Sequence, residues 1–187
     1  MLIVLDAGHG YATPGKRSVD GMKEFEFNRD VAIKLKTKLE EHWEIHILFS
    51  HSDKRDVPLK ERIDFANEKQ ADLFVSIHAN ASGNGTEWNE ACGIETYVHT
   101  SFPLKAFQLA QVIQRTLVKA TGRKNRGVKG AEFYVLKHTK MPSVLIECGF
   151  MTNKEEAAFL KSESYREKCS KAIADSITEY FHLLRKV

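Results

Sequence analysis

The sequence predicts an α/β fold: a single twisted, mostly parallel (mixed) sheet of about six strands flanked by helices. Short apolar runs rich in β-branched residues are typical of buried parallel strands, and they cover residues 2–6, 72–77 and 144–147. Between them lie longer segments whose apolar residues recur every three or four positions, which is typical of helices that bury one side. This alternation of strand and helix along the chain favours one sheet with helices around it.

The first half of the chain predicts two strands, each followed by a helix. A strand over 2–6 leads through a glycine-rich loop, 8–21, to a helix over about 23–41. The buried side of that helix is marked by Phe27, Val31, Leu35 and Leu39. A second strand is predicted over 44–49 and a helix over about 57–69, with Pro58 in its first turn. Either Asp53 or Asp56 is expected to cap this helix.

The second half continues the pattern after the strand at 72–77. A polar loop, 81–91, precedes a fourth strand at 94–99, and Pro103 opens an amphipathic helix that Gly122 ends. The buried side of this helix is expected to hold Phe107, Ala110, Ile113 and Leu117. Residues 128–135 are predicted to be extended and 144–147 to form the last central strand. The final helix, about 164–184, is expected to bury Cys169, Ile173, Ile177, Phe181 and Leu184.

The composition is that of an ordinary globular protein. The 187 residues contain 42% apolar and 28% charged side chains, which fits one domain over 1–187 with a sizeable core. The formal net charge of +3 is a mild basic bias that suits a polyanionic neighbour. No basic run is interleaved with aromatic residues, so a nucleic-acid partner is not expected.

The cysteines and the chain ends restrict the cellular setting. Cys92, Cys148 and Cys169 are odd in number and irregularly spaced, so we expect reduced thiols in or near the core. No apolar stretch approaches the roughly 20 residues of a membrane span. Met1 runs directly into a strand without a basic leader, so the sequence is expected to be made in the cytoplasm without a signal peptide.

Three chemically active residues stand at the ends of predicted strands. His9 and His78 each end an apolar run, and Glu147 ends a third run. In open α/β sheets, ligands bind outside the carboxyl ends of the strands. Two imidazoles and a carboxylate at that edge predict a catalytic metal centre, although a single histidine in such a position is more often a satisfied hydrogen-bonding residue.

A hydrolytic zinc site usually has three protein ligands and leaves one position for water. Glu24 is the best-placed third ligand, because it follows the loop that leaves His9. Glu26 is its rival, but on a helix it points about 200° away, so the two cannot both face the metal. Asp6 and Asp20 are weaker candidates, and Asp6 is expected to brace the loop of His9 or the second nitrogen of a ligand.

Glu147 lies inside an apolar run, where an unpaired carboxylate is costly and needs an explanation. We expect it to act as general base toward a water that the metal activates, and then as general acid toward the leaving nitrogen. Two histidines and one glutamate on a metal, with a further catalytic glutamate, are typical of zinc peptidases, so the bond broken is expected to be an amide.

These residues lie in sequence blocks that resemble the zinc-dependent N-acetylmuramoyl-L-alanine amidases of the type 3 family. The blocks follow the family's order over nearly the whole chain. They are residues 5–10, 21–24, 59–62 with 66–67, 71–80, 93–97, and 133–136 through 141–153. The two most specific are Ser76-Ile77-His78-Ala79-Asn80 and Pro142-Ser143-Val144-Leu145-Ile146-Glu147.

The resemblance implies Zn²⁺ on His9, Glu24 and His78, with Glu147 as the catalytic carboxylate. It implies cleavage of the amide between N-acetylmuramic acid and L-alanine, with peptidoglycan as the partner. It also favours Glu24 over Glu26.

Two departures from the family bear on the biological role. Thr100 and Ser101 lead almost directly to Pro103, so the long insertion that controls some Gram-negative members is absent. No wall-binding module follows, so the chain is either a truncated catalytic domain or a minimal enzyme. We expect a phage or prophage endolysin, released through a holin, with a sporulation enzyme that acts at mother-cell lysis as the alternative.

Two other functions compete with this interpretation. A non-catalytic wall-binding or regulatory protein on the same scaffold would be expected to lack a ligand or Glu147, and both are present. A different zinc hydrolase, such as a peptidase or a sugar deacetylase, is excluded only by the resemblance, although the HExxH spacing of common zinc peptidases is missing.

The contacts with substrate are predicted in outline. The loop 81–91, which contains Trp88, and the segment 126–134 are expected to frame the groove. Asn80 and Arg62 are candidate substrate-binding residues, and a structural ion pair is the main alternative for Arg62. We expect the protein to be a monomer.

Overall fold

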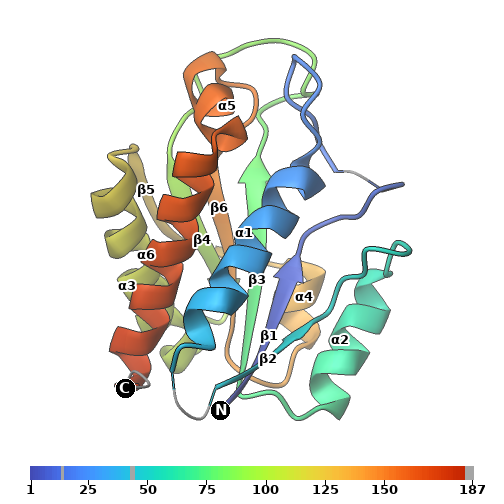
Figure 1. Cartoon of the computed structure of the whole chain (residues 1–187), viewed down its shortest axis with the longest axis vertical. Coiled ribbons are helices and arrows are strands. Elements are labelled where there is room, and N and C mark those ends of the chain that lie inside the picture. Colours follow the sequence, from blue (N-terminus) through green and yellow to red (C-terminus); the bar gives the residue numbers. More distant parts are fainter. Residues whose placement is uncertain (14, 43–44, 184–187) are drawn as a thin grey trace.

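Six strands form one sheet at the centre of the structure, a computed structural model that describes residues 1–13, 15–42 and 45–183 (Figure 1). The strands are β1 (Leu2–Ala7), β2 (His46–Phe49), β3 (Leu73–Asn80), β4 (Ile94–His99), β5 (Asn125–Ala131) and β6 (Ser143–Phe150). Their order is β2-β1-β3-β6-β4-β5, and every neighbouring pair is parallel except β4 with β6. This confirms the predicted mixed, mostly parallel α/β sheet.

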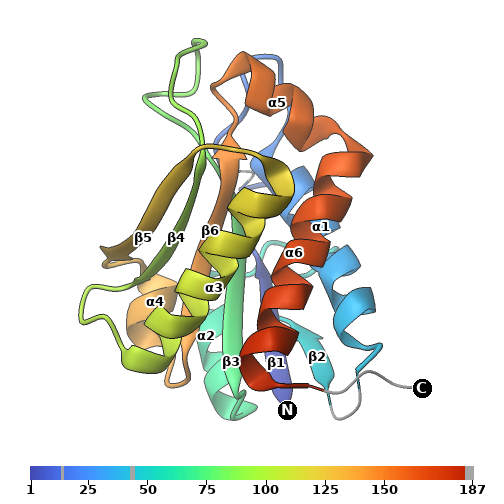
Figure 2. The ribbon, with the colours of Figure 1, turned by 90° about the vertical axis from the view of Figure 1, so that its left-hand side faces the viewer.

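The two faces of the sheet are covered unequally (Figures 1 and 2). One face packs against α1 (Glu24–Leu39), α3 (Leu104–Thr121) and α6 (Glu163–Phe181), and it holds the larger apolar core. The other face carries the shorter helices α2 (Leu59–Glu68) and α4 (Tyr134–His138), over a smaller apolar cluster around Val4, Phe74 and Leu145. The second face is therefore the one on which polar side chains can line an open site.

Most predicted elements are confirmed with small shifts at their ends. β3 and β6 run farther than predicted, so that His78 and Glu147 lie inside strands. Gly122 ends α3 with a left-handed φ of 68°, as expected of a C-terminal glycine. The final helix begins at Glu163 and ends at Phe181, while residues 44 and 184 of the predicted elements lie outside the described residues.

The predicted extended segment over 128–135 is wrong at its end. β5 begins earlier, at Asn125, and stops at Ala131, and Tyr134–His138 forms α4. This short helix buries Val135 and Leu136 against the smaller core, which the apolar pattern alone does not distinguish from a strand.

The helix α5 (Lys154–Lys161) was not predicted, although its capping signal is present. The side chain of Asn153 accepts hydrogen bonds from the backbone N–H groups of Glu155 and Glu156. An asparagine before two acidic residues is a usual helix start.

The predicted caps for α2 were wrong because both aspartates are used elsewhere. Asp53 pairs with Arg29, and Asp56 accepts a hydrogen bond from the backbone N–H of Ala12. The N-cap position is taken by Pro58, which makes no side-chain capping bond.

Two of the cysteines, Cys148 and Cys169, are buried and Cys92 is partly exposed, and all three are free thiols as expected. Within the described part of the chain, none of the helices combines the length and the apolar character needed to cross a membrane.

Candidate functional site

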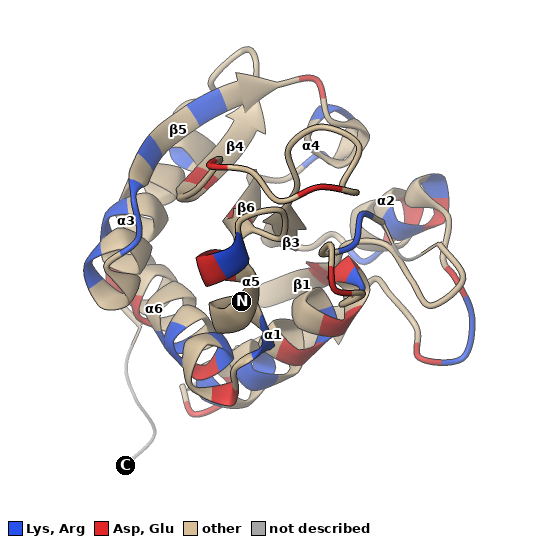
Figure 3. Ribbon diagram, turned by 90° about the horizontal axis from the view of Figure 1, so that it is seen from above, with Lys and Arg blue, Asp and Glu red and all other residues tan. Residues whose placement is uncertain are grey.

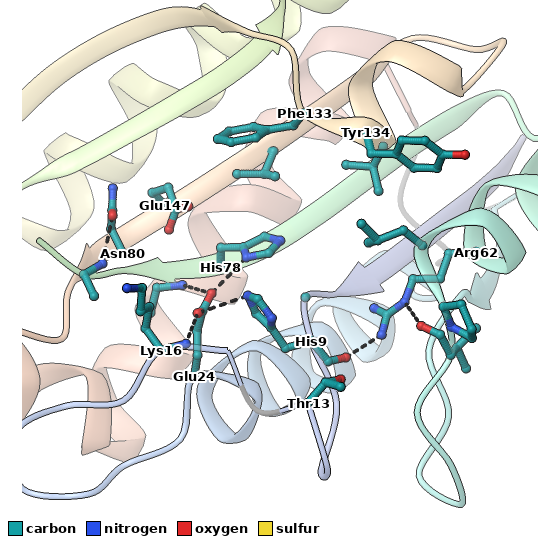
Figure 4. A pocket seen from close by; sticks show the side chains of 18 residues that line it. His9, Thr13, Lys16, Glu24, Arg62, His78, Asn80, Phe133, Tyr134 and Glu147 are labelled. Atoms are coloured by element: carbon teal, nitrogen blue, oxygen red, sulfur yellow. Dashed lines mark hydrogen bonds and ion pairs between the residues drawn. The ribbon is translucent and has the colours of Figure 1, made fainter. Parts of the chain in front are cut away.

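The structure brings the three predicted metal ligands together at the carboxyl end of the parallel strands (Figure 4). His9 follows β1, Glu24 is the first residue of α1, and His78 lies in β3. One ligand atom from each lies within 4.8 Å of the others. Glu24 stands between the imidazoles, with 2.8 Å from Oε1 to His78 Nδ1 and 3.2 Å from Oε2 to His9 Nε2.

The rival acids do not reach this cluster. Glu26 is exposed, while Glu24 is only 3% exposed. Asp20 pairs with Lys161 at the surface, and Asp6 is buried below the site. The helical geometry of α1 thus turns Glu24 inward and Glu26 outward, as expected for two side chains about 200° apart around a helix.

Two glycines make room for the cluster. A Cβ on Gly8 would lie 2.1 Å from Cε1 of His78, and a Cβ on Gly15 would lie 2.6 Å from Oε2 of Glu24. Any other residue at either position would have to displace a candidate ligand. His9 itself has a φ of 68°, a conformation that costs free energy for a non-glycine residue and that directs its ring toward Glu24.

A buried hydrogen-bond chain orients the imidazole of His78. The hydroxyl of Ser76 donates to Oδ2 of Asp6 at 2.6 Å, and His78 Nε2 lies 3.1 Å from the same hydroxyl oxygen. Because the only hydroxyl proton goes to Asp6, Ser76 accepts from His78, so that Nε2 carries the proton. Nδ1, which lies 2.8 Å from Oε1 of Glu24, is then the nitrogen that a metal would bind in place of a proton.

Asp6 is the fixed charge at the base of this chain. Burial favours its neutral form, but the charge of Arg62 and hydrogen bonds from Ser50 and Ser76 outweigh burial and lower the pKa of Asp6. Asp6 therefore stays ionised and braces a ligand's second nitrogen through Ser76, the supporting role that the sequence predicted for it.

Arg62 makes the ion pair that was the alternative to substrate binding. It is 2% exposed and donates to Asp6 Oδ1 at 2.8 Å and to the carbonyl of Ala7 at 2.6 Å. It also donates to the carbonyl of His9. These bonds hold the end of β1 and the His9 turn, so Arg62 supports the position of a candidate ligand from below.

Glu147 lies beside the cluster, and one of its carboxylate oxygens is buried without a partner in the described part of the chain. It is opposite His78 in the parallel pairing of β3 with β6. Its Oε2 is buried and has no hydrogen-bond partner among the described residues. Burial raises the pKa of Glu147 well above its ordinary value, and the neighbouring charges of Glu24 and Glu95 add to this. A carboxyl group with high proton affinity and a free oxygen is suited to accept and return a proton.

A cavity of about 570 Å³ opens in front of these residues. Its polar side is formed by the candidate ligands, Asn80 and Glu147, and its apolar side by Val57, Pro58, Leu59, Phe133 and Tyr134. The last two belong to the segment 126–134 that was expected to frame the groove. Of the loop 81–91 only Ala81 lines the cavity, and Trp88 does not.

Asn80 reaches the rim of the cavity but uses its amide within the chain. Its Nδ2 donates to Glu95 Oε1 at 2.7 Å, and its Oδ1 accepts from the backbone N–H of Ala81 at 2.8 Å. The sequence did not predict Glu95 as part of the site. The period of two in the strand, which puts Glu95 and Tyr97 on one face, is the signal that could have found it.

The donor set fits a zinc ion. Two imidazole nitrogens and one carboxylate, with an open side toward the cavity, match the usual ligands of catalytic zinc. Burial disfavours the ionised form of Glu24, but hydrogen bonds with His78 and His9 lower its pKa to about 2. Glu24 is therefore an ionised carboxylate, as a metal ligand must be.

Comparison with known proteins agrees with this geometry. A family model described as N-acetylmuramoyl-L-alanine amidase matches residues 3–179. The chain is 40% identical over 180 residues to the amidase LytC of Bacillus subtilis, covering 96% of this chain but only 35% of LytC. It is 35% identical over 190 residues to the endolysin of Bacillus phage SPP1, covering 99% of this chain and 68% of that protein.

Solved structures share the whole fold. The crystal structure of an N-acetylmuramoyl-L-alanine amidase from Clostridium difficile 630 superposes with a TM-score of 0.91 at 34% identity, covering 97% of this chain and 96% of that one. The sequence match over residues 3–179 includes all three candidate ligands and Glu147. The chain therefore belongs to the N-acetylmuramoyl-L-alanine amidase family Amidase_3.

Proposed function

We propose that this chain hydrolyses the amide bond between N-acetylmuramic acid and L-alanine in peptidoglycan, with Zn²⁺ held by His9, Glu24 and His78. The observation that carries the proposal is the meeting of these ligands beside Glu147, which lines the same cavity. Membership of the amidase family supports the choice of substrate.

Each residue has a role that follows from its position. When bound here, zinc would polarise the amide carbonyl and lower the pKa of water. Glu147, which lines the cavity, takes the proton of the attacking water on its carboxylate and delivers it to the leaving nitrogen of L-alanine. Asp6 and Ser76 keep His78 protonated on Nε2, and Arg62 holds the backbone of His9.

The test is digestion of purified cell walls followed by mass spectrometry of the soluble products. The proposal predicts intact stem peptides with a free L-alanine amino terminus, and their loss with a chelator or with Glu147→Ala. Glu26→Ala is the matched control, because Glu26 is a nearby but exposed acid on the same helix. Cleavage inside the stem peptide or loss of acetyl groups would identify another zinc hydrolase, and wall binding without release would identify a non-catalytic protein.

We propose further that the domain serves as an endolysin, made in the cytoplasm and acting on the wall after release. Similarity to the phage SPP1 endolysin supports this role. The higher identity to LytC supports a bacterial enzyme, and a 31% identity to a sporulation-specific amidase of Bacillus subtilis supports the sporulation alternative. Expression from within a host cell, with and without a holin, tests the role. Lysis that depends on the holin supports it, and lysis confined to sporulating mother cells contradicts it.

We also propose that the domain acts as a monomer, since the described ligands and Glu147 all come from one chain. Light scattering across a range of protein concentrations tests this, and a stable dimer at assay concentration would contradict it.

A further inference from the structure

A row of ionisable side chains crosses four strands on the open face of the sheet. His78 on β3 is opposite Glu147 on β6, and Glu147 is opposite Glu95 on β4. The pairing of β4 with β5 shifts register between Ile94 and Thr96. Arg126 of β5 extends back toward β4, and its Nε lies 3.1 Å from Oε2 of Glu95. The row therefore leads from the candidate metal ligands to the basic residues at the sheet edge.

Cations outnumber acids at the far end of this row. Glu95 pairs with both Arg126 and Lys129, so two positive charges surround one buried carboxylate. Burial favours neutral Glu95, but hydrogen bonds from Lys129 and Arg126 outweigh it and lower the pKa of Glu95. Figure 3, viewed from the end of the sheet where the site lies, shows the basic residues as blue bands along β5. One positive charge is left over for an anion.

The two cations are held in place while remaining accessible. Glu95 is 2% exposed, whereas the side chains of Arg126 and Lys129 are 30% and 38% exposed. The guanidinium of Arg126 also lies over the ring of Phe150, 4.8 Å from its centroid. A guanidinium fixed by an aromatic ring and a buried carboxylate loses little entropy when it binds an anion.

We propose that Arg126 and Lys129 form a subsite for a free carboxylate of the peptidoglycan stem peptide, borne by the residue that follows L-alanine. The inference rests on the proposed amidase function, because it assumes that the scissile bond lies at the His9, Glu24 and His78 cluster. It assigns the peptide side of the substrate to β4 and β5 and leaves the apolar wall at Phe133 and Tyr134 to the glycan side.

The dimensions agree with this placement. Neighbouring strands lie about 4.8 Å apart, so Glu95 is roughly 10 Å along the row from His78. An extended peptide advances about 3.5 Å per residue, so a carboxylate on the second residue lies roughly 7 Å from the scissile nitrogen. The side chains of Arg126 and Lys129 turn back toward Glu95 and can close the remaining gap.

The test compares two synthetic disaccharide pentapeptides that differ at one group. In the first substrate the second stem residue is D-glutamate, whose α-carboxylate is free. In the second substrate that residue is D-isoglutamine, in which the α-carboxylate is replaced by an amide. The zinc-loaded protein is expected to cleave the acid at least about fivefold better in kcat/KM, the size of a partly exposed charge-assisted hydrogen bond. Lys129→Met and Arg126→Met should each reduce this preference, lowering kcat/KM for the acid more than kcat/KM for the amidated substrate.

Lys137→Met is the matched control, since Lys137 is an exposed lysine of α4 that pairs with Glu132. It should keep the wild-type preference. The subsite is overturned if the wild type cleaves both substrates equally or cleaves neither. It is also overturned if Lys129→Met lowers kcat/KM equally for both substrates. If the protein still releases stem peptides from whole walls, the proposed amidase function is supported and only the subsite is wrong. If it is inactive on walls, both proposals are contradicted.

Discussion

The hydroxyl of Ser76 decides which nitrogen of His78 faces the other candidate ligands. It gives its proton to Asp6 and accepts one from His78 Nε2. The imidazole is thereby held in one orientation before a metal arrives. Partners of this kind behind a ligand commonly change metal affinity by about 10–100-fold.

We therefore predict that Ser76→Ala weakens zinc binding by about tenfold or more, because His78 loses its acceptor at Nε2. Competition against a chromophoric chelator measures the affinity. Ser176→Ala is the matched control, a buried serine that bonds to the carbonyl of Ala172 within α6. Unchanged affinity in Ser76→Ala would show that the hydroxyl does not orient the ligand.

Glu147 is expected to destabilise the metal-free protein at neutral pH. Its raised pKa means that the folded state keeps a proton that the unfolded state releases, so stability falls as pH rises above the ordinary value of 4.5. Each pKa unit of the shift corresponds to about 1.4 kcal/mol.

We predict that Glu147→Gln raises the Tm of the metal-free protein at pH 7.5 by at least about 2–4 °C, the shift for 1 kcal/mol in a chain of this size. The difference should narrow as pH falls toward 4.5 and close below it, where Glu147 becomes protonated in the unfolded state as well. Thermal melts across this range measure it. A lower Tm for the variant at pH 7.5 would mean that the carboxylate is stabilised by contacts the structure does not contain.

The sequence predicted the main site residues because they stand at the ends of apolar runs, where chain order alone brings side chains to one edge. It left Glu24 and Glu26 open, since only the orientation of α1 separates a buried from an exposed acid two positions apart. Ser76 and Glu95 were missed because their importance comes from cross-strand neighbours, and strand pairing is not visible in a single sequence.

At the scale of elements, β1, α2 and the His9 turn are joined by one buried ion pair. Arg62 of α2 contacts Asp6 of β1 and the backbone carbonyls of Ala7 and His9. Removing one member of a buried pair leaves an uncompensated charge, which costs about 3–5 kcal/mol.

We predict that Arg62→Met lowers the free energy of unfolding by about 3–5 kcal/mol. The double variant Arg62→Met with Asp6→Asn should lose less than the sum of the single variants, since no lone charge remains. Urea denaturation of all four proteins measures the coupling. Additive losses would show that the two side chains do not act as a pair.

The helices α4 and α5 show where local sequence patterns are insufficient. α4 has 5 residues and α5 has 8, too short for a helical period to stand out from a strand or loop. Asn153 offered the clearer signal for α5, because its side chain binds two backbone N–H groups at the helix start.

Asn153→Ala should therefore cost about 1 kcal/mol of stability, the usual value for a lost N-cap, with little change in hydrolytic rate. Denaturant unfolding and a wall-digestion assay measure the two quantities. Lys154→Ala, the adjacent exposed position, serves as control and should change neither. A loss of stability no larger than that of the control would mean that the cap is replaced by water.

At the scale of the whole molecule, the site exists because the two faces of the sheet are covered unequally. Three long helices bury one face, and the short α2 and α4 leave the carboxyl edge of the other open to the cavity. The alternation of strands and helices was sufficient to predict the fold class. It could not predict the strand order, because the antiparallel joining of β4 to β6 depends on how the connections cross the sheet.

The central claim is that one divalent ion joins His9, Glu24 and His78, and it is tested most directly by diffraction from crystals of active protein grown with zinc. Data on both sides of the zinc absorption edge locate the ion without assumptions about its ligands. We predict one anomalous peak about 2.0–2.2 Å from an atom of each of the three side chains, with an open position toward Glu147. An enzymatically active crystal with no peak there, or with these side chains turned apart, would contradict it.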